Sequence, residues 1–229
     1  MVRIWIGYDE AETVAYHVLS HSILENASVP VSIAPLKKEL FRGFFNRKRG
    51  EYDSTDFAIT RFLVPYLCDF QGYAVFMDCD MLCTGDVGEL ANYLTRMDHY
   101  NIAVRVVKHE YTPTTEKKFL GHVQTKYEKK NWSSVMLFNN ALCRKLTPEY
   151  VEKTHGLDLH QFTWCTPWQI GGLPKEWNYL VGEYPKPEKP PKLYHYTLGT
   201  PCFDKYKNGP YSWLWHQCKE RMLSAKDDN

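Results

Sequence analysis

The stretch that decides the fold is YAVFMDCDML, residues 73–82, in which an apolar run leads directly into two aspartates. The run from Tyr73 to Met77 has the pattern of a short strand buried on both faces of a sheet. Asp78 and Asp80 follow it with only Cys79 between them. Carboxylates beside a dry core are costly unless a positive charge meets them. The stretch therefore predicts a central strand that ends in a site for a cation.

The composition predicts an ordinary globular protein. The chain has 229 residues, a net charge of +1, 44% hydrophobic and 24% charged residues, which fits one domain spanning residues 1–229. A charge this near zero gives no field that would attract nucleic acid or an anionic membrane, and no apolar run approaches the length of a membrane span. The chain has seven cysteines, an odd number without a Cys-x-x-Cys pair, which predicts reduced thiols and a cytoplasmic location.

Strands alternate with helices along the chain. Apolar runs predict strands at 2–8 and 31–36, and helical patterns predict helices at 11–25 and 56–68. Further strands are expected at 102–107, 135–138 and 193–196, and a last helix at 212–222. This alternation is typical of an α/β fold with a mainly parallel central sheet and helices on both faces. Ligands bind such sheets beyond the carboxyl ends of the strands, so Tyr8 and Asp9 are expected at the same edge as the aspartate pair.

Hard oxygen ligands on a tight turn suit Mg²⁺ or Mn²⁺, with substrate phosphates filling the other positions. A solvated loop or a pair of helix caps is the plainer interpretation of Asp78 and Asp80, but the apolar run before them places the first carboxylate close to the core. A calcium loop would need a third acid and a central glycine. A two-carboxylate glycosidase would hold its acids on opposite sides of a bond.

Six segments resemble one enzyme family. VFMDCDML resembles the Asp-x-Asp strand of GT-A glycosyltransferases, the Rossmann-like nucleotide-diphospho-sugar transferases, and in particular retaining glycosyltransferase family 8, which includes glycogenin and bacterial lipopolysaccharide galactosyltransferases. Five other segments resemble family motifs in the same order, namely IGYDE, STDFAITRFLVPYL, NWSSVMLFN, LPKEWNYL and YHYTLGTPCF. The resemblance spans most of the chain and looks closest to a little-characterised bacterial branch.

The resemblance implies a metal-dependent transferase. It would move a sugar with retention of configuration from a nucleoside-diphosphate sugar, UDP-glucose or UDP-galactose, to a saccharide, lipid or small-molecule acceptor. The metal, Mn²⁺ or Mg²⁺, would be held by Asp78, Asp80 and His195. Nucleic-acid partners are not expected.

The family's remaining roles carry over residue by residue. The resemblance assigns nucleotide contacts to Gly7, Tyr8, Asp9, Arg61, Asp78, Gly199 and Thr200. It assigns donor-sugar contacts to Asp56, Trp132, Ser133, Ser134 and Gln169. Catalytic roles fall to Asp56, Arg61 and Gln169.

Two departures from the family pattern favour other functions. Trp168 stands where the family has a carboxylate, and the lysine that follows the family's glycine loop is missing, with Lys205 or Lys207 as substitutes. One alternative is therefore a nucleotide-sugar-binding protein with little turnover. A second alternative is a metal-dependent nucleotidyltransferase or sugar-nucleotide hydrolase on a similar sheet.

Overall fold

The computed structural model describes residues 1–50, 55–110 and 128–224, and within them the strands form two sheets. The larger sheet has six strands in the order β2-β1-β3-β6-β5-β7. Its strands are β1 (Val2–Gly7), β2 (Val31–Leu36), β3 (Tyr73–Met77), β5 (Val104–Val106), β6 (Val135–Asn139) and β7 (Ile170–Gly172). The smaller sheet has the order β4-β9-β8, with β4 at Met81–Cys83, β8 at Tyr179–Leu180 and β9 at Leu193–His195.

The large sheet is mixed but mostly parallel. β1 runs parallel to both β2 and β3, and β5 runs parallel to β7. β6 is the exception, because it pairs antiparallel with β3 and with β5. The predicted α/β fold with a mainly parallel sheet is confirmed, and the reversal at β6 is the feature that strand alternation did not predict.

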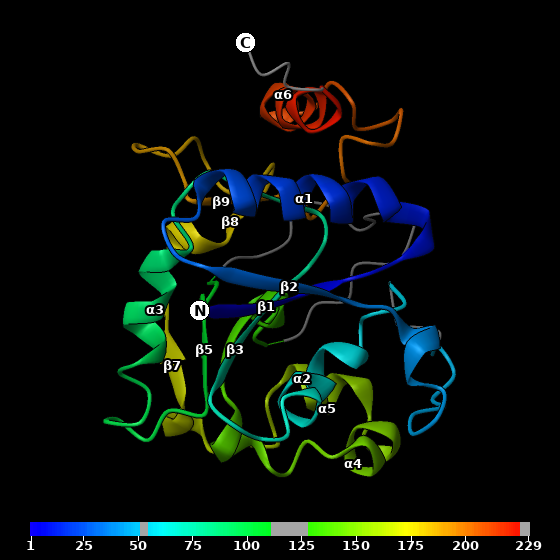
Figure 1. Cartoon of the computed structure of the whole chain (residues 1–229), viewed down its shortest axis with the longest axis vertical. Helices are drawn as coiled ribbons and strands as arrows, with labels where there is room; N and C mark the ends of the chain where they lie inside the picture. Colours follow the sequence, from blue (N-terminus) through cyan, green and yellow to red (C-terminus); the bar gives the residue numbers. More distant parts are fainter. Residues whose placement is uncertain (51–54, 111–127, 225–229) are drawn as a thin grey trace.

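Helices cover both faces of the large sheet. The helices are α1 (Thr13–Asn26), α2 (Val64–Leu67), α3 (Gly88–Leu94), α4 (Pro148–Lys153), α5 (Gly156–His160) and α6 (Ser212–Leu223). Figure 1 shows α1 above the sheet, with α6 stacked on its outer side, and α2, α4 and α5 gathered below it. Residues from Ala74 to Met77 in β3 are therefore fully buried, which is why the strand reads as an unbroken apolar run.

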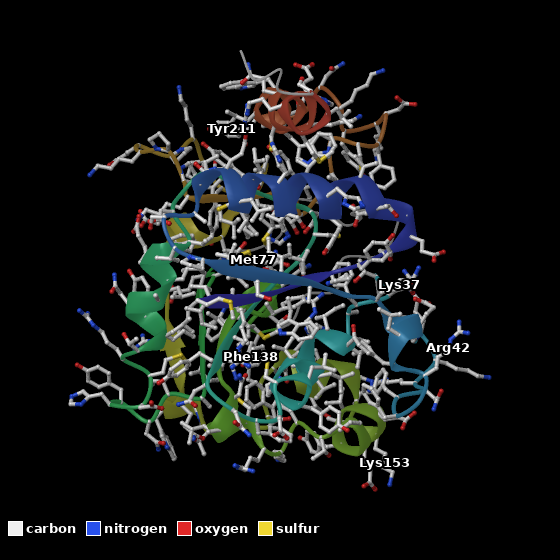
Figure 2. The ribbon with its side chains drawn as sticks, in the orientation of Figure 1. Lys37, Arg42, Met77, Phe138, Lys153 and Tyr211 are labelled. Carbon is white, nitrogen blue, oxygen red and sulfur yellow. The ribbon has the colours of Figure 1, made fainter. Side chains whose placement is uncertain are left out.

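The side chains follow this layering. Figure 2 shows Met77 at the end of β3 and Phe138 in β6 within the interior, while Lys37, Arg42 and Lys153 lie toward the periphery. β2 is an edge strand and contains Pro35. A proline cannot donate to a second neighbouring strand, so it fits an edge position.

The helix predicted at 56–68 is wrong over most of its length. The chain forms a bend and turns from Thr55 to Ile59. A 3-10 helix, η3 (Thr60–Leu63), follows, and only then does α2 begin. Pro65 explains the late start, since proline lacks a backbone N–H and its ring clashes with the carbonyl four residues earlier in a helix interior. In α2 this proline lies in the first turn, where a helix tolerates it. Among the described helices, none has the length and apolarity that crossing a membrane requires.

Candidate functional site

The two aspartates lie where the chain passes from the large sheet to the small one. Asp78 follows β3, and Asp80 precedes β4. The turn is fixed by its backbone, because Asp78 N donates to Ser134 O at 2.9 Å and Tyr196 N donates to Asp80 O at 2.9 Å. Cys79, between them, is fully buried and anchors the turn in the core. Both carboxylates are thereby held at the end of a central strand, as the sequence predicts.

His195 joins the pair through the small sheet. β9 runs antiparallel to β4, and the register places His195 opposite Met81, the residue after Asp80. Its Nε2 lies 3.3 Å from Asp80 Oδ1, and one ligand atom from each of Asp78, Asp80 and His195 lies within 4.8 Å of the others. Two carboxylate oxygens and an imidazole nitrogen are a donor set that suits Mn²⁺ and also accepts Mg²⁺. The described residues thus fit the divalent cation that the sequence implied.

Arg61 supplies a fixed positive charge beside this group. Its Nη1 lies 2.8 Å from Asp78 Oδ1 and donates to Ser133 O at 2.9 Å. The guanidinium carbon lies 4.9 Å from the ring centre of Phe76 and 5.3 Å from that of Phe57. The side chain is 7% exposed, so the guanidinium is buried against these two rings. In this structure it faces Asp78, which places it next to the possible metal-ligand group.

The end of β1 has a structural role in addition to its predicted role in nucleotide binding. Asp9 Oδ1 accepts from Ala11 N at 2.9 Å, and Oδ2 accepts from Asp56 N at 3.1 Å. The carboxylate therefore caps the following turn and ties the segment at Asp56 to the first strand. Tyr8 is half-buried, with its hydroxyl 3.1 Å from Thr13 Oγ1. A Cβ on Gly7 would lie 2.4 Å from the Phe57 ring, so this glycine allows close packing.

The glycine loop after β9 reaches the same region. Gly199 has φ of +154°, and a Cβ there would lie 2.1 Å from the ring of Tyr206. Only glycine fits this close approach. The next residue, Thr200, is fully buried and donates from Oγ1 to Glu12 Oε1 at 2.5 Å. The loop predicted to hold phosphate is thus tied to the segment that follows β1.

The predicted sugar-binding segment, Trp132 to Ser134, forms a 3-10 helix before β6. Trp132 donates from its indole to His109 O at 3.0 Å. Ser133 Oγ lies 2.7 Å from His160 Nδ1, and Ser134 Oγ donates to Asn131 O at 2.6 Å. Both serine hydroxyls are hydrogen-bonded within the protein. Ser133 is linked to Asp78 through Arg61, and the carbonyl of Ser134 accepts from Asp78 N.

The other predicted catalytic and sugar-binding residues are held by neighbours within their own loops. Asp56 Oδ1 lies 3.5 Å from Arg49 Nη1. Burial of this carboxyl, and then the charge of Asp9, raise the pKa of Asp56. Gln169 lies in a short turn before β7, the far edge strand of the large sheet. The strand registers place Ile170, the first residue of β7, level with Ala74 near the start of β3, so Gln169 lies at the edge of the sheet opposite Asp78. Its Oε1 accepts from Thr166 N and Oγ1 at 3.2 and 2.9 Å, so the side-chain oxygen serves a capping box.

Glu12 is a site residue that the sequence analysis missed. It is 3% exposed, and its carboxylate accepts from Thr200 Oγ1 and, at 3.6 Å, from Cys79 Sγ. Burial, followed by the charge of Asp80 and a smaller contribution from Asp9, raises the pKa of Glu12 to about 8. In the sequence this residue reads as one more acid at a helix start, so no local pattern marks it.

Asn178 is a second missed residue. It is fully buried, and its Oδ1 lies 2.9 Å from His195 Nδ1. The asparagine belongs to the segment LPKEWNYL, residues 173–180, which resembles a family motif. The resemblance assigned no role to this asparagine.

No protein-family model matches the chain, but a curated relative does. Protein CDI of Arabidopsis thaliana is 42% identical over 221 residues, which are 93% of this chain and 84% of that protein. This relative comes from a plant, whereas the motifs had suggested a bacterial branch.

Several solved glycosyltransferases share the fold. The galactosyltransferase LgtC, solved with donor and acceptor sugar analogues, has a TM-score of 0.60 at 11% identity over 99% of this chain and 98% of its own. The glycosyltransferase GlyE of Streptococcus pneumoniae has a TM-score of 0.59 at 15% identity, over 98% of this chain and 60% of its own. The bifunctional WbbM has a TM-score of 0.59 at 17% identity over 95% of this chain, which spans about half (51%) of the WbbM chain. Identities this low establish the fold alone, which is the GT-A fold. On the strength of its plant relative, the chain belongs to the family of Protein CDI.

Proposed function

We propose that the protein is a metal-dependent glycosyltransferase that moves a hexose from a nucleoside-diphosphate sugar to an acceptor with retention of configuration. The observation that carries the proposal is the group of Asp78, Asp80 and His195, whose ligand atoms lie within 4.8 Å of one another at the end of a central strand. The GT-A fold supports it, because LgtC, which has the same fold, was solved with donor and acceptor sugar analogues.

Asp78, Asp80 and His195 would hold Mn²⁺ or Mg²⁺. When bound, such a cation neutralises the negative charge that grows on a departing diphosphate. Arg61 keeps Asp78 oriented through the 2.8 Å ion pair and adds a permanent positive charge at the same place. The loop at Gly199 and Thr200 would face the diphosphate, since backbone N–H groups in such loops suit phosphate oxygens.

The remaining contacts follow the order of the elements. Tyr8 and Asp9, at the end of β1, would meet the base and ribose of a UDP-linked donor, glucose or galactose. The donor sugar would lie toward the segment from Trp132 to Ser134, with Asp56, whose backbone N–H donates to Asp9, beside it. Gln169 lies at the opposite edge of the sheet and is not part of this pocket. All seven cysteines are free, which supports a further proposal that the protein works in the reducing cytoplasm.

A specific observation also favours a second function, binding of a nucleotide sugar with little turnover. Trp168 takes the place of the family carboxylate and is 75% exposed, while the side-chain oxygen of Gln169 is bonded to Thr166. Retaining transfer by front-face attack would use the departing phosphate as base, so it requires no carboxylate at this position. Product formation separates the two functions.

A panel of sugar nucleotides with Mn²⁺ tests the proposal. A ligand at 100 times its dissociation constant adds about 2.7 kcal/mol to the stability of the folded protein, which a thermal unfolding assay detects. We expect a UDP-sugar to stabilise the wild type, and Asp80→Asn to abolish the Mn²⁺-dependent part.

The stabilising donor is then incubated with candidate acceptors. A glycosylated acceptor and released UDP support the transferase. Pyrophosphate, or free sugar without acceptor, identifies the nucleotidyltransferase or hydrolase instead, and stabilisation without any product identifies the binding protein. If no sugar nucleotide stabilises the wild type in the presence of Mn²⁺, the proposed function is wrong.

A further inference from the structure

His195 is a buried ring with a different group at each nitrogen. The side chain is 3% exposed. Nε2 faces Asp80 Oδ1 at 3.3 Å, and Nδ1 faces Asn178 Oδ1 at 2.9 Å. Only the nitrogen without a hydrogen can bind a metal ion, so the tautomer of the ring decides whether Nε2 is available.

The hydrogen bonds behind Asn178 settle which tautomer the ring adopts. They start at Asn131 O, a backbone carbonyl that can only accept. Ser134 Oγ donates its hydrogen to this carbonyl at 2.6 Å, so the hydroxyl presents a lone pair to Asn178. Asn178 Nδ2 donates to that hydroxyl at 2.7 Å and to the carbonyl at 3.4 Å. The amide nitrogen is therefore on the serine side, and the amide oxygen is on the histidine side.

An amide oxygen accepts and cannot donate. Nδ1 of His195 must then carry the hydrogen, and in the neutral ring Nε2 presents its lone pair toward the carboxylate of Asp80. Two electron-rich atoms 3.3 Å apart repel each other, and a divalent cation that both of them bind removes this repulsion.

We propose that Asn178 is a positioning residue that fixes His195 in the Nδ1–H tautomer and so keeps Nε2 available to the metal ion. The inference rests on the proposed function, because it assigns a role within the same metal site. It explains why the residue is an asparagine. Aspartate would keep the acceptor for His195 but would set a carboxylate against the Asn131 carbonyl. Alanine would remove both bonds and would allow Nε2 to carry a hydrogen and donate it to Asp80.

Nitrogen-15 NMR of the histidine rings tests the tautomer without metal or substrate. Spectra are recorded in EDTA at a pH where the rings are neutral, and the His195 signals are assigned by their loss in His195→Gln. We expect the Nδ1–H tautomer in the wild type and in Asn178→Asp, and a population shift toward Nε2–H in Asn178→Ala. Asn140→Ala is the matched control, because Asn140 is also fully buried but its amide donates to Gln71 O, away from the histidine.

Calorimetric titration of Mn²⁺ in the presence of UDP then tests the consequence. Loss of a residue that orients a metal ligand lowers metal affinity by roughly 10- to 100-fold, and we expect this for Asn178→Ala but not for Asn140→Ala. Asn178→Asp should retain more affinity than Asn178→Ala, since it keeps the acceptor. If Asn178→Ala does not fold, the aspartate variant and the wild-type tautomer still decide the matter.

The outcomes separate this inference from the proposed function. An Nε2–H ring in the wild type, or an unchanged tautomer and Mn²⁺ affinity in Asn178→Ala, overturns the positioning role while a metal-binding wild type leaves the proposed function intact. A wild type that keeps the Nδ1–H tautomer but binds no Mn²⁺ with UDP overturns the proposed function, and the metal role of Asn178 with it.

Discussion

Glu12→Gln should remove a pH dependence from the stability of the metal-free protein. Burial and the charges of Asp80 and Asp9 disfavour the ionised form of Glu12 in the folded state, and raise its pKa to about 8 from an ordinary value of 4.5. Glutamine has nearly the same shape and keeps an oxygen that accepts from Thr200. It does not titrate, so the variant changes the charge and little else.

The sign and size follow from linkage between proton binding and folding. Because the folded pKa is raised, the stability contributed by protonated Glu12 is fully present below pH 4.5 and is lost as the pH rises to about 8. Each pH unit in this window costs about 1.4 kcal/mol, and the whole window on the order of 5 kcal/mol. Wild type and Glu12→Gln should therefore be most alike near pH 5, and the variant should become progressively the more stable of the two toward pH 8.

Urea unfolding in EDTA at several pH values between about 5 and 8.5 measures this difference, since titrating groups away from Glu12 are common to both proteins and cancel. Glu10→Gln is the matched control. Glu10 lies two residues away, but it is exposed, and its bond to Lys37 lowers its pKa, so this variant should show no divergence that grows toward alkaline pH. Parallel stability curves for wild type and Glu12→Gln would show that the carboxyl is ionised at little cost, and the account of its environment would be wrong.

Three further predictions concern the metal group. Asp78→Asn and Asp80→Asn should each abolish the Mn²⁺-dependent stabilisation by UDP in thermal unfolding while leaving the fold intact by circular dichroism; wild-type turnover in both variants would contradict the metal site. His195→Ala should lower Mn²⁺ affinity about 10-fold or more and reduce the preference for Mn²⁺ over Mg²⁺, because nitrogen is the softer ligand; calorimetry with each ion measures both, and unchanged values would leave His195 as a core residue. Arg61→Met should cost about 3 kcal/mol in urea unfolding, since it leaves a carboxylate that is only 14% exposed without its cation. Arg61→Met combined with Asp78→Asn should recover part of the loss; equal losses in the single and double variants would argue against the ion pair.

The sequence predicted the parts of the fold that local pattern determines. The unbroken apolar run of β3 and the aspartates after it both lie where they were expected. The helix expected over residues 56–68 forms only as α2, because Pro65 is tolerated in the first turn of a helix but not in its interior. The helical spacing of the apolar side chains did not reveal this restriction. The direction of β6 was not predictable, because every residue of this strand is buried and a strand buried on both faces reads as a continuous apolar run whichever way it runs.

The sequence predicted only those residues of the candidate site that belong to recognisable motifs. His195 was assigned to the metal through family resemblance, and the register of β9 against β4 is what brings it to Asp80. Glu12 and Asn178 were missed for one reason. Their partners are far away in the sequence, Thr200 at 188 residues from Glu12 and Ser134 at 44 residues from Asn178, so neither is visible before the chain is folded.

The acidic groups around the β3–β4 turn differ in what balances their charge, and the differences indicate where a cation belongs. Asp9 is bonded to two backbone N–H groups, Asp78 is paired with Arg61, and Glu12 is held neutral over much of the pH range by its raised pKa. Asp80 faces the Nε2 of His195, which in the tautomer proposed above offers a lone pair and no hydrogen. A divalent cation held by Asp80 and His195, with Asp78 as its third protein ligand, would remove the repulsion between the carboxylate and this lone pair. The same charge distribution that makes the metal-free site costly at alkaline pH would therefore favour the binding of a metal ion.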